Sequence, residues 1–373
     1  MIEGIKVIEI GQVLAAPYAA MVLADLGAEV IKIEKPDGGD DARRMGMPYK
    51  TGDGMTFTEI NRNKASVALD LKSETGRADL HRLLADADVL IHNLRPGIAD
   101  EFELDGKRLC ERYPRLIYCE ISGFGDRGPL KNLGAFEPIA QAFSGLISIN
   151  GNPDGPSARV GAPVIDIGTA MWIVIGTLSA LYRREQTGKG CLVNASLMET
   201  GLTWVGTNAS AFLNLGQKPK RLGTANPNLV PYQAFATTDG EILIAAGNDR
   251  LFAKLAGALG RPEWARDERF VTNRARLKNR EAIVDLVARE IATNAKGHWF
   301  ALLAKAGVPC GPVNTVPEAI ADPQVQALDI LRPMPENGAT VAGLPLRFDG
   351  ERPRFRSAAP KLGANNDLLN KLK

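Results

Sequence analysis

The carboxylate with the clearest chemical potential is Asp166, which lies in the apolar stretch APVIDIGTAMW at residues 162–172. The next 16 residues, 167–182, carry no charge, which indicates a buried helix beginning at Asp166 and too short to span a bilayer comfortably. Two interpretations of this aspartate remain open. As a helix N-cap, it would accept backbone N–H bonds and complement the helix dipole. As a nucleophile, it would be activated by apolar surroundings that remove its hydration, while the helix amides limit the rise of its pKa.

A second candidate is the turn GQVLAAP at residues 11–17, which follows a predicted strand where a dinucleotide-binding fold places GxGxxG. Glu34 stands about where the ribose-binding acid of such a fold would be. Val13 and Ala16 occupy the second and third glycine positions, and a valine side chain blocks close approach of the backbone to a pyrophosphate. The pattern therefore disfavours a nicotinamide cofactor. The sequence TGKG at residues 187–190 lacks phosphate-loop spacing and predicts a turn.

Histidine and cysteine chemistry is weakly supported. None of the histidines lies near a serine or cysteine in a hydrolase motif, so each is predicted to be a surface or structural residue: His81, His92 and His298. The cysteines form no CxxC pair and no zinc set, and they indicate a reduced, cytoplasmic protein: Cys110, Cys119, Cys191 and Cys310. No metal site is expected.

The elements that would position these residues alternate between strands and helices in the first third of the chain. Apolar and alternating runs predict strands at residues 6–10, 30–34, 89–91 and 116–122, with helices at 17–27 and around 80–84. This order predicts an α/β fold with a parallel sheet covered by helices. Ligands of such sheets bind at the carboxyl ends of the strands.

A change of pattern after the basic loop QKPKRLG predicts a second, smaller domain. Residues 232–246 are expected to form a hairpin turning at Asp239-Gly240, followed by helices at 250–259, 281–291 and 298–306. The expected domains are a large α/β domain over 1–224, a small α+β domain over 225–325, and a C-terminal segment, 326–373, that returns to the large domain. In that segment we expect a short strand, LPLRF at 344–348, and a closing helix at 367–372.

The charge balance limits the classes of partner. The 373 residues carry 45 Lys+Arg against 43 Asp+Glu, a formal charge of +2. Such a near-neutral chain provides no general field for nucleic acid or for a membrane surface, so an anionic ligand requires a local cluster of charge. A small anionic ligand is compatible with this composition.

Six segments in one order resemble the family III (CaiB/BaiF-type) CoA-transferases, which include formyl-CoA and carnitine CoA-transferases and, more distantly, α-methylacyl-CoA racemase. They are the opening GIKVIEIGQVLAAPYAAMVLADLGAEVIKIEKPDGGDDAR, then NRNKASVALDLKS, HNLRPG, GAFEPIAQAFSG, the Asp166 segment with ALYRREQTGKG, and AGVPCGPVNTVPEAIADPQV. The resemblance covers essentially the whole chain. It implies a Rossmann-like large domain built from both chain ends, a smaller domain, and a homodimer of two interlocked chains.

The resemblance also implies a reaction. Asp166 falls on the family's nucleophile, which forms an aspartyl-acyl anhydride and then an aspartyl-CoA thioester, so that two easier steps replace one hard step. Glu137 is expected to position Asp166 or the transferred group, and the amides near Val13 and Leu14 to stabilise the thioester oxyanion. Coenzyme A and its acyl thioesters are substrates, and no tightly bound cofactor is expected.

The family's CoA contacts fall on a scattered set of residues. The expected contacts are Val13, Leu14, Ala15, Lys35, Leu69, Lys72, Asn93, Leu94, Arg95, Ile98 and Phe136. Lysines there would neutralise phosphates as point charges. Glu101 and Gly134 depart from the family pattern at positions often held by arginine and lysine, which leaves part of the phosphate contacts open.

The acceptor acid and two other functions remain as alternatives. Arg43 and Arg44 either hold the far carboxylate of a dicarboxylic acid or are ordinary surface arginines. A small dicarboxylate or hydroxy acid is favoured as acceptor, with succinyl-CoA as donor. A racemase would need a histidine where this chain has Phe136, and so lacks its second base. The remaining alternative is a CoA-binding protein without catalysis.

Overall fold

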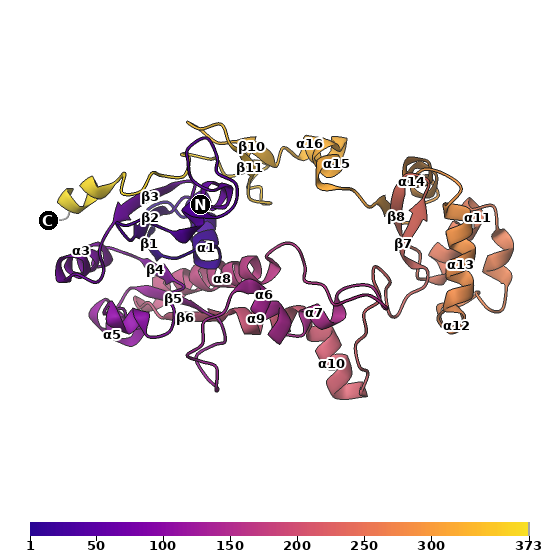
Figure 1. Ribbon diagram of the computed structural model, residues 1–373, viewed down its shortest axis with the longest axis horizontal. Coiled ribbons are helices and arrows are strands. Elements are labelled where there is room, and N and C mark those ends of the chain that lie inside the picture. Colours follow the sequence, from indigo (N-terminus) through magenta and orange to yellow (C-terminus); the bar gives the residue numbers. More distant parts are fainter. Residues whose placement is uncertain (372–373) are drawn as a thin grey trace. The chain divides into compact units, whose positions relative to one another are not determined.

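The chain forms two compact units. The computed structural model describes residues 1–371 (Figure 1). The larger unit comprises residues 1–147, 159–218 and the segment from 328 onward, and the smaller comprises 148–158 and 219–327. The sequence predicts a smaller domain at 225–325, and the structure adds the segment 148–158 to it. That segment is held by Arg221, which donates hydrogen bonds to the carbonyls of Asn152 and Gly155.

A six-stranded parallel sheet lies at the centre of the larger unit, in the order β3-β2-β1-β4-β5-β6. Its strands are β1 Lys6–Ile10, β2 Glu29–Glu34, β3 Lys64–Ala68, β4 Val89–His92, β5 Ile117–Ser122 and β6 Leu192–Ser196. Most residues of the inner strands are buried because helices cover both faces. From β1 the chain adds β2 and β3 on one side, and it then returns to the other side of β1 and adds β4, β5 and β6 there. The gap between the carboxyl ends of β1 and β4 is therefore the switch point where ligands bind in such sheets.

Two helices cover one face of this sheet. Helix α1 (Ala15–Asp25) and helix α8 (Val164–Thr187) pack against each other and share one apolar core with β1, β4 and β5. The buried side of α1 is mostly alanine, whose small side chain lets helix and sheet approach closely. The expected helix began at Pro17, two residues late, because Pro17 is the third residue of α1 and not its first. Helices α3 (Glu74–Leu84) and α5 (Gly106–Arg112) contribute to the core on the opposite face.

Helix α8 carries Asp166 but does not begin there. It begins at Val164, after Pro163, and ends at Thr187; the next residue, Gly188, has a φ of 70°, which confirms the predicted turn at TGKG. Within residues 1–371, α8 is the one helix whose length and apolar composition would suffice to cross a membrane. Half of its most apolar stretch is buried inside the protein. Its inner face packs in the core, as expected from the sequence.

The C-terminal segment returns to the larger unit and lies along β3. The N–H of Asn365 donates to the Ser66 carbonyl, the N–H of Ser66 donates to Asn365 Oδ1, and the Asn366 side chain accepts the N–H of Ala68 at 2.8 Å. The closing helix is a 3-10 helix, Asn366–Lys371, and the expected residue Leu372 lies outside the described residues. The strand expected at 344–348 is wrong: Phe348 forms a single bridge, and the hairpin lies upstream.

The other elements of the larger unit are short. They are η1 Asp41–Arg44, α2 Met55–Ile60, α4 Ile98–Glu101, α6 Glu137–Phe143, α9 Leu197–Trp204, α10 Gly206–Leu215, and the hairpin of β10 Leu331–Pro333 and β11 Thr340–Ala342. Helix α7, Leu146–Ile149, contains the boundary between residues 147 and 148. Helix α6 and the start of α8 frame the site described below.

The smaller unit is an antiparallel sheet with helices. Strands β7 (Tyr232–Thr237), β8 (Gly240–Ala245) and β9 (Cys310–Pro312) pair in that order. The hairpin is confirmed, but its two-residue loop is Thr238-Asp239, because Thr237 pairs with Gly240. Its helices are α11 Asp249–Ala258, η2 Pro262–Arg266, α12 Asn273–Lys278, α13 Arg280–Ile291, α14 Lys296–Lys305, α15 Val316–Ala321 and α16 Pro323–Leu328.

Candidate active site

A cavity of about 520 Å³ opens at the switch point of the sheet. Its walls come from the segments that follow three strands and from the starts of two helices. They include Gln12–Ala15 after β1, Asn93–Pro96 and Ile98 after β4, Ser122 and Gly123 at the end of β5, residues 133–137, and Asp166. The cavity therefore brings together segments that are far apart in the sequence, as expected for the carboxyl edge of a parallel sheet.

Two hydrogen bonds join the loops after β1 and β4. The backbone N–H of Gln12 donates to Asn93 Oδ1 at 2.8 Å, and Asn93 Nδ2 donates to the Gln12 carbonyl at 2.9 Å. This reciprocal pair fixes the two cavity walls relative to each other. Asn93 lines the cavity and also has this structural role.

His92, at the end of β4, is a buried structural residue. The Tyr118 hydroxyl donates to the Leu104 carbonyl at 2.7 Å, so the contact of 2.6 Å between this hydroxyl and His92 Nε2 requires a proton on Nε2. His92 Nδ1 then accepts the N–H of Leu94 at 3.3 Å. Burial lowers the pKa of His92 to about 4, so the imidazole is neutral at physiological pH and holds the start of the cavity wall.

Asp166 lies in the first turn of α8 and lines the cavity. It is the third residue of the helix and makes no capping hydrogen bond, so the N-cap interpretation is wrong. Its place in the first turn still puts it near the positive end of the helix dipole. Burial raises the pKa of Asp166 to about 7, and the negative charge of Glu137 adds to the rise. At neutral pH this carboxylate is poorly solvated and close to its own pKa, as in many functional sites.

Glu137 connects the start of α6 to the start of α8. This buried side chain accepts a hydrogen bond from Gln141 Nε2 at 2.7 Å and from the backbone N–H of Ile165 at 3.4 Å. Gln141 in turn accepts the N–H of Val160 at 2.9 Å, in the loop before α8. Glu137 therefore acts on Asp166 in two ways: it holds the residue next to it, and it places a second negative charge near it.

Most of the expected CoA contacts line the cavity, but three do not. The cavity is lined by Val13, Leu14, Ala15, Asn93, Leu94, Arg95, Ile98 and Phe136, and also by Gly134. Lys35 instead forms an exposed ion pair with Asp41 at 2.9 Å, Leu69 is buried in the core, and Lys72 is exposed beyond β3. Glu101 lies at the end of α4, outside the cavity walls.

The amide of Val13 is not available for an oxyanion. Its N–H donates to Asp40 Oδ1 at 3.0 Å, which corrects the expectation that it stabilises the thioester. Leu14 precedes α1 and lines the cavity. The first amides of a helix have no acceptor within the helix, so Leu14 and its neighbour Ala15 remain the candidate donors.

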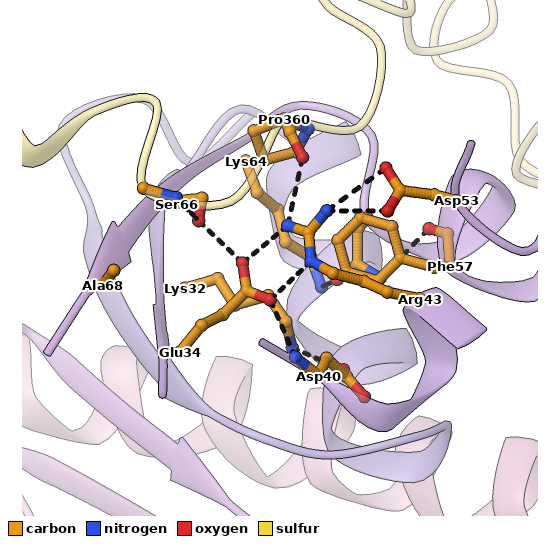
Figure 2. A network of polar contacts seen from close by, with 12 residues as sticks. Lys32, Glu34, Asp40, Arg43, Asp53, Phe57, Lys64, Ser66, Ala68 and Pro360 are labelled. Atoms are coloured by element: carbon orange, nitrogen blue, oxygen red, sulfur yellow. Dashed lines mark hydrogen bonds and ion pairs between the residues drawn. The ribbon is translucent and has the colours of Figure 1, made fainter. Parts of the chain in front are cut away.

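Arg43 is a structural residue, which corrects its assignment to the acceptor acid. Figure 2 shows its guanidinium between two carboxylates: Glu34 accepts at 2.7 and 2.8 Å, and Asp53 at 3.1 Å. It also donates to the Pro360 carbonyl and stacks on Phe57. Every nitrogen of this side chain is therefore occupied inside the protein. Because Glu34 is buried in this ion pair, it is not positioned to bind a ribose hydroxyl.

Arg44 is exposed and lies outside the cavity walls. It donates to the Gly38 carbonyl at 2.6 Å and pairs with Asp41 at 3.0 Å. It thus fits the alternative of an ordinary surface arginine.

Several residues of the site were not expected from the sequence. Gln12, Asp41 and Ser122 line the cavity, and a buried set of charges lies beside it: Glu9, Lys32, Asp40 and Lys64. One signal was present, because Glu9 and Lys32 stand between apolar residues inside β1 and β2. A charge inside a central strand of a parallel sheet must be paired there, since it cannot reach water. Among the described residues, no group of histidine, cysteine or acidic side chains is arranged to hold a metal ion.

Comparison with known proteins identifies the class of this fold and cavity. CoA-transferase family III matches residues 2–366, so the chain belongs to this family and is a CoA-transferase. It is 38% identical to acetyl-CoA:oxalate CoA-transferase of Acetobacter aceti, covering 99% of this chain and 95% of that protein. It is 37% identical to succinate–glutarate CoA-transferase of Agrobacterium fabrum, covering 97% and 93%.

A solved structure supports the same assignment for the fold. The crystal structure of a CAIB/BAIF family protein from Brucella suis matches with a TM-score of 0.89 at 37% identity, covering 100% of this chain and 99% of that chain. The α/β architecture expected from the resemblance is thereby confirmed. Acyl-CoA is the substrate class of such enzymes.

Proposed function

We propose that this enzyme transfers CoA from an acyl-CoA donor, succinyl-CoA foremost, to a small dicarboxylic acid, with Asp166 as the nucleophile. The observation that carries the proposal is the position of Asp166: a poorly solvated carboxylate, with its pKa raised to about 7, in the wall of the switch-point cavity. Removal of water makes a carboxylate more reactive. It also protects an anhydride from hydrolysis.

The reaction conserves the energy of the thioester. An oxygen of Asp166 attacks the donor thioester carbonyl, the C–S bond breaks, and CoA leaves as thiolate with an aspartyl anhydride behind. The thiolate attacks the aspartyl carbonyl, which releases the donor acid and forms an aspartyl-CoA thioester. The acceptor carboxylate displaces CoA to give a new anhydride, and the thiolate then attacks its acyl carbonyl. Acceptor acyl-CoA leaves and the Asp166 carboxylate is restored.

Mass spectrometry after mixing the enzyme with succinyl-CoA tests this proposal directly. We expect a mass increase of one CoA, less water, on the peptide that contains Asp166. With hydroxylamine the adduct is replaced by a hydroxamate on the same side chain. Acetyl-CoA serves as the second donor. Measurable CoA binding without an adduct from either donor would contradict covalent transfer through Asp166.

A dicarboxylic acceptor is supported by the relatives and by the charge of the cavity. The two relatives described above are named for oxalate, succinate and glutarate. Of the residues that line the cavity, Arg95 is the one with a fixed positive charge. Within residues 1–371 no hydrogen bond or ion pair engages its guanidinium, so its bidentate fork is free for a carboxylate. We therefore assign the far carboxylate of the acid to Arg95.

Replacing Arg95 by Gln tests this assignment. The KM for a dicarboxylic acceptor is expected to rise about tenfold to a hundredfold, because a charge-assisted pair is lost, while the KM for acetate changes little. Steady-state kinetics with both acids provide the measurement. Arg44→Gln, which removes an exposed arginine outside the cavity, is the matched control. An increase in the KM for acyl-CoA with either acceptor would instead assign Arg95 to a CoA phosphate.

We also propose that the enzyme is a cytoplasmic homodimer. Large apolar side chains are exposed on three helices of the larger unit, which is unusual for a monomer. They include Trp172 and Ile175 on α8, Trp204 on α9, and Phe212 and Leu213 on α10, with Leu213 78% exposed. A second copy of the chain would cover them.

Light scattering of the purified enzyme is expected to give about twice the chain mass of 40.1 kDa. Leu213→Glu would weaken the dimer, because it places a charge in the apolar contact. Glu185→Gln, on the exposed end of α8, is the control. A stable monomer at micromolar concentration would contradict the proposed assembly.

A further inference from the structure

A neutral network of four buried charges lies next to the loop that carries Val13. Glu9 Oε1 lies 2.7 Å from Lys32 Nζ, and Glu9 Oε2 lies 2.9 Å from Lys64 Nζ. Asp40 Oδ2 completes the set at 2.9 Å from Lys32 Nζ. All four side chains are buried from solvent, and Figure 2 shows Lys32, Asp40 and Lys64 close to one another.

The pKa values of Lys32 and Asp40 both favour an ion pair between them in the folded protein. Burial alone would lower the pKa of Lys32, but Glu9 and Asp40 outweigh it and hold that pKa above its usual range. Burial would likewise raise the pKa of Asp40, but Lys32 and two backbone amides hold it below its usual value. Lys64 differs, because burial lowers its pKa to about 8 against the attraction of Glu9. The lowered pKa favours the ionised carboxylate of Asp40, which accepts hydrogen bonds.

The carboxylate of Asp40 accepts hydrogen bonds from two backbone N–H groups, one of which lies in the loop that lines the cavity, Gln12–Ala15. Its Oδ1 accepts the N–H of Val13 at 3.0 Å and the N–H of Ala42 at 2.9 Å. Val13 has a φ of 66°, in the left-handed region that is costly for a β-branched residue. Two residues before Val13, Lys32 donates to the Gly11 carbonyl at 3.0 Å. The ion pair thus holds the backbone at the strained residue itself, through the N–H of Val13, and two residues before it, through the carbonyl of Gly11.

We propose that Asp40 is a positioning residue for the acyl-CoA substrate, which it serves by keeping Val13 in this left-handed conformation. The inference rests on the proposed function. Val13, Leu14 and Ala15 line the same cavity as Asp166, so the path of this loop sets where the thioester can lie. Removing one partner of a buried ion pair destabilises the fold wherever the pair lies, so the effect specific to Asp40 is expected in substrate affinity.

The first test is Asp40→Ala in the full-length enzyme, with CoA affinity measured by calorimetry and KM and kcat measured with succinyl-CoA. The Kd for CoA and the KM for succinyl-CoA are expected to rise about tenfold, and kcat to fall less than about threefold. Asp25→Asn is the matched control, since Asp25 is equally buried, pairs with Arg62 at 2.7 Å, and lies outside the cavity walls. It should lose stability and keep the Kd of the wild type.

The second test asks whether the effect passes through Val13. Glycine adopts a positive φ without strain, so Val13→Gly should restore most of the lost CoA affinity in the Asp40→Ala background. Asp40→Asn, which keeps the side-chain volume, replaces Asp40→Ala if that variant does not fold.

Three outcomes would overturn the inference: an unchanged Kd in the Asp40 variant, an equal loss in Asp25→Asn, or a loss that Val13→Gly does not reduce. Failure of the wild type to bind CoA would instead overturn the proposed function, so the two failures are distinguishable.

Discussion

Asp166→Asn is expected to lower CoA transfer by at least about a thousandfold while CoA still binds with nearly the wild-type Kd. The amide has the shape of the carboxylate but cannot form an anhydride, so both covalent intermediates are lost. Turnover with succinyl-CoA and a dicarboxylic acid, together with calorimetry of CoA binding, measures the two effects separately. Retained transfer would contradict the nucleophile assignment. Loss of binding together with turnover would point to a misfolded site.

The same substitution should stabilise the protein at alkaline pH. In the folded enzyme the pKa of Asp166 is raised to about 7, whereas an unfolded aspartate titrates near its ordinary value. Below that ordinary value Asp166 is protonated in both the folded and the unfolded state, so it does not change the free energy of unfolding. Between it and pH 7 the unfolded state releases the proton first, so stability falls as pH rises and the cost is complete above pH 7.

Asparagine stays neutral and avoids this cost. The carboxylate lines an open cavity, so we expect a discounted gain of about 1 kcal/mol, a Tm higher by roughly 2–4 °C at pH 8. Thermal melts of both proteins at pH 4 and pH 8 measure it. The difference should be nearly lost at pH 4, and a variant that is less stable at pH 8 would contradict the raised pKa.

The central fold was predictable because parallel strands and their helices leave local signals. The run KVIEI predicts a strand at 6–10, and β1 has the same first and last residue. The hairpin of the smaller unit is also predicted, but its turn lies one residue earlier than expected. These elements depend on apolar periodicity and on turn residues, both of which are local. The strand expected at 344–348 failed because the apolar residues there pack as extended chain: Leu344 is buried in the core without pairing in a ladder.

The roles of single charges were less predictable, since they depend on contacts between distant segments. Arg43 and Arg44 are neighbours with the same charge, yet one is buried between Glu34 and Asp53 and the other is exposed. The carbonyl of Pro360, more than 300 residues away, completes the burial of Arg43. No local pattern reports such a contact. Asp166 was found from sequence because its apolar surroundings are themselves local.

Glu137→Gln should move the pH dependence of the reaction, because Glu137 contributes both charge and position to Asp166. The wild-type kcat/KM for acyl-CoA is expected to rise with pH through about 7, as Asp166 loses its proton. Removing the negative charge of Glu137 favours the ionised form of Asp166. The midpoint should therefore move down by about half a unit to one unit. Burial, the larger cause of the raised pKa, remains and keeps the midpoint above that of an exposed aspartate.

A second substitution separates charge from position. Glutamine can still accept the hydrogen bonds from Gln141 and from the N–H of Ile165, whereas Glu137→Ala removes them and frees the start of α8. We therefore expect the same acid shift in both variants, but a loss of about tenfold to a hundredfold in kcat for the alanine variant alone. Glu185→Gln, at the far end of α8, should leave the profile unchanged. If Glu137→Gln leaves the midpoint in place while Glu137→Ala lowers kcat, the residue acts only by position. A midpoint that rises in Glu137→Gln would contradict the charge coupling itself, because removing a like charge cannot hold the proton on Asp166 more tightly.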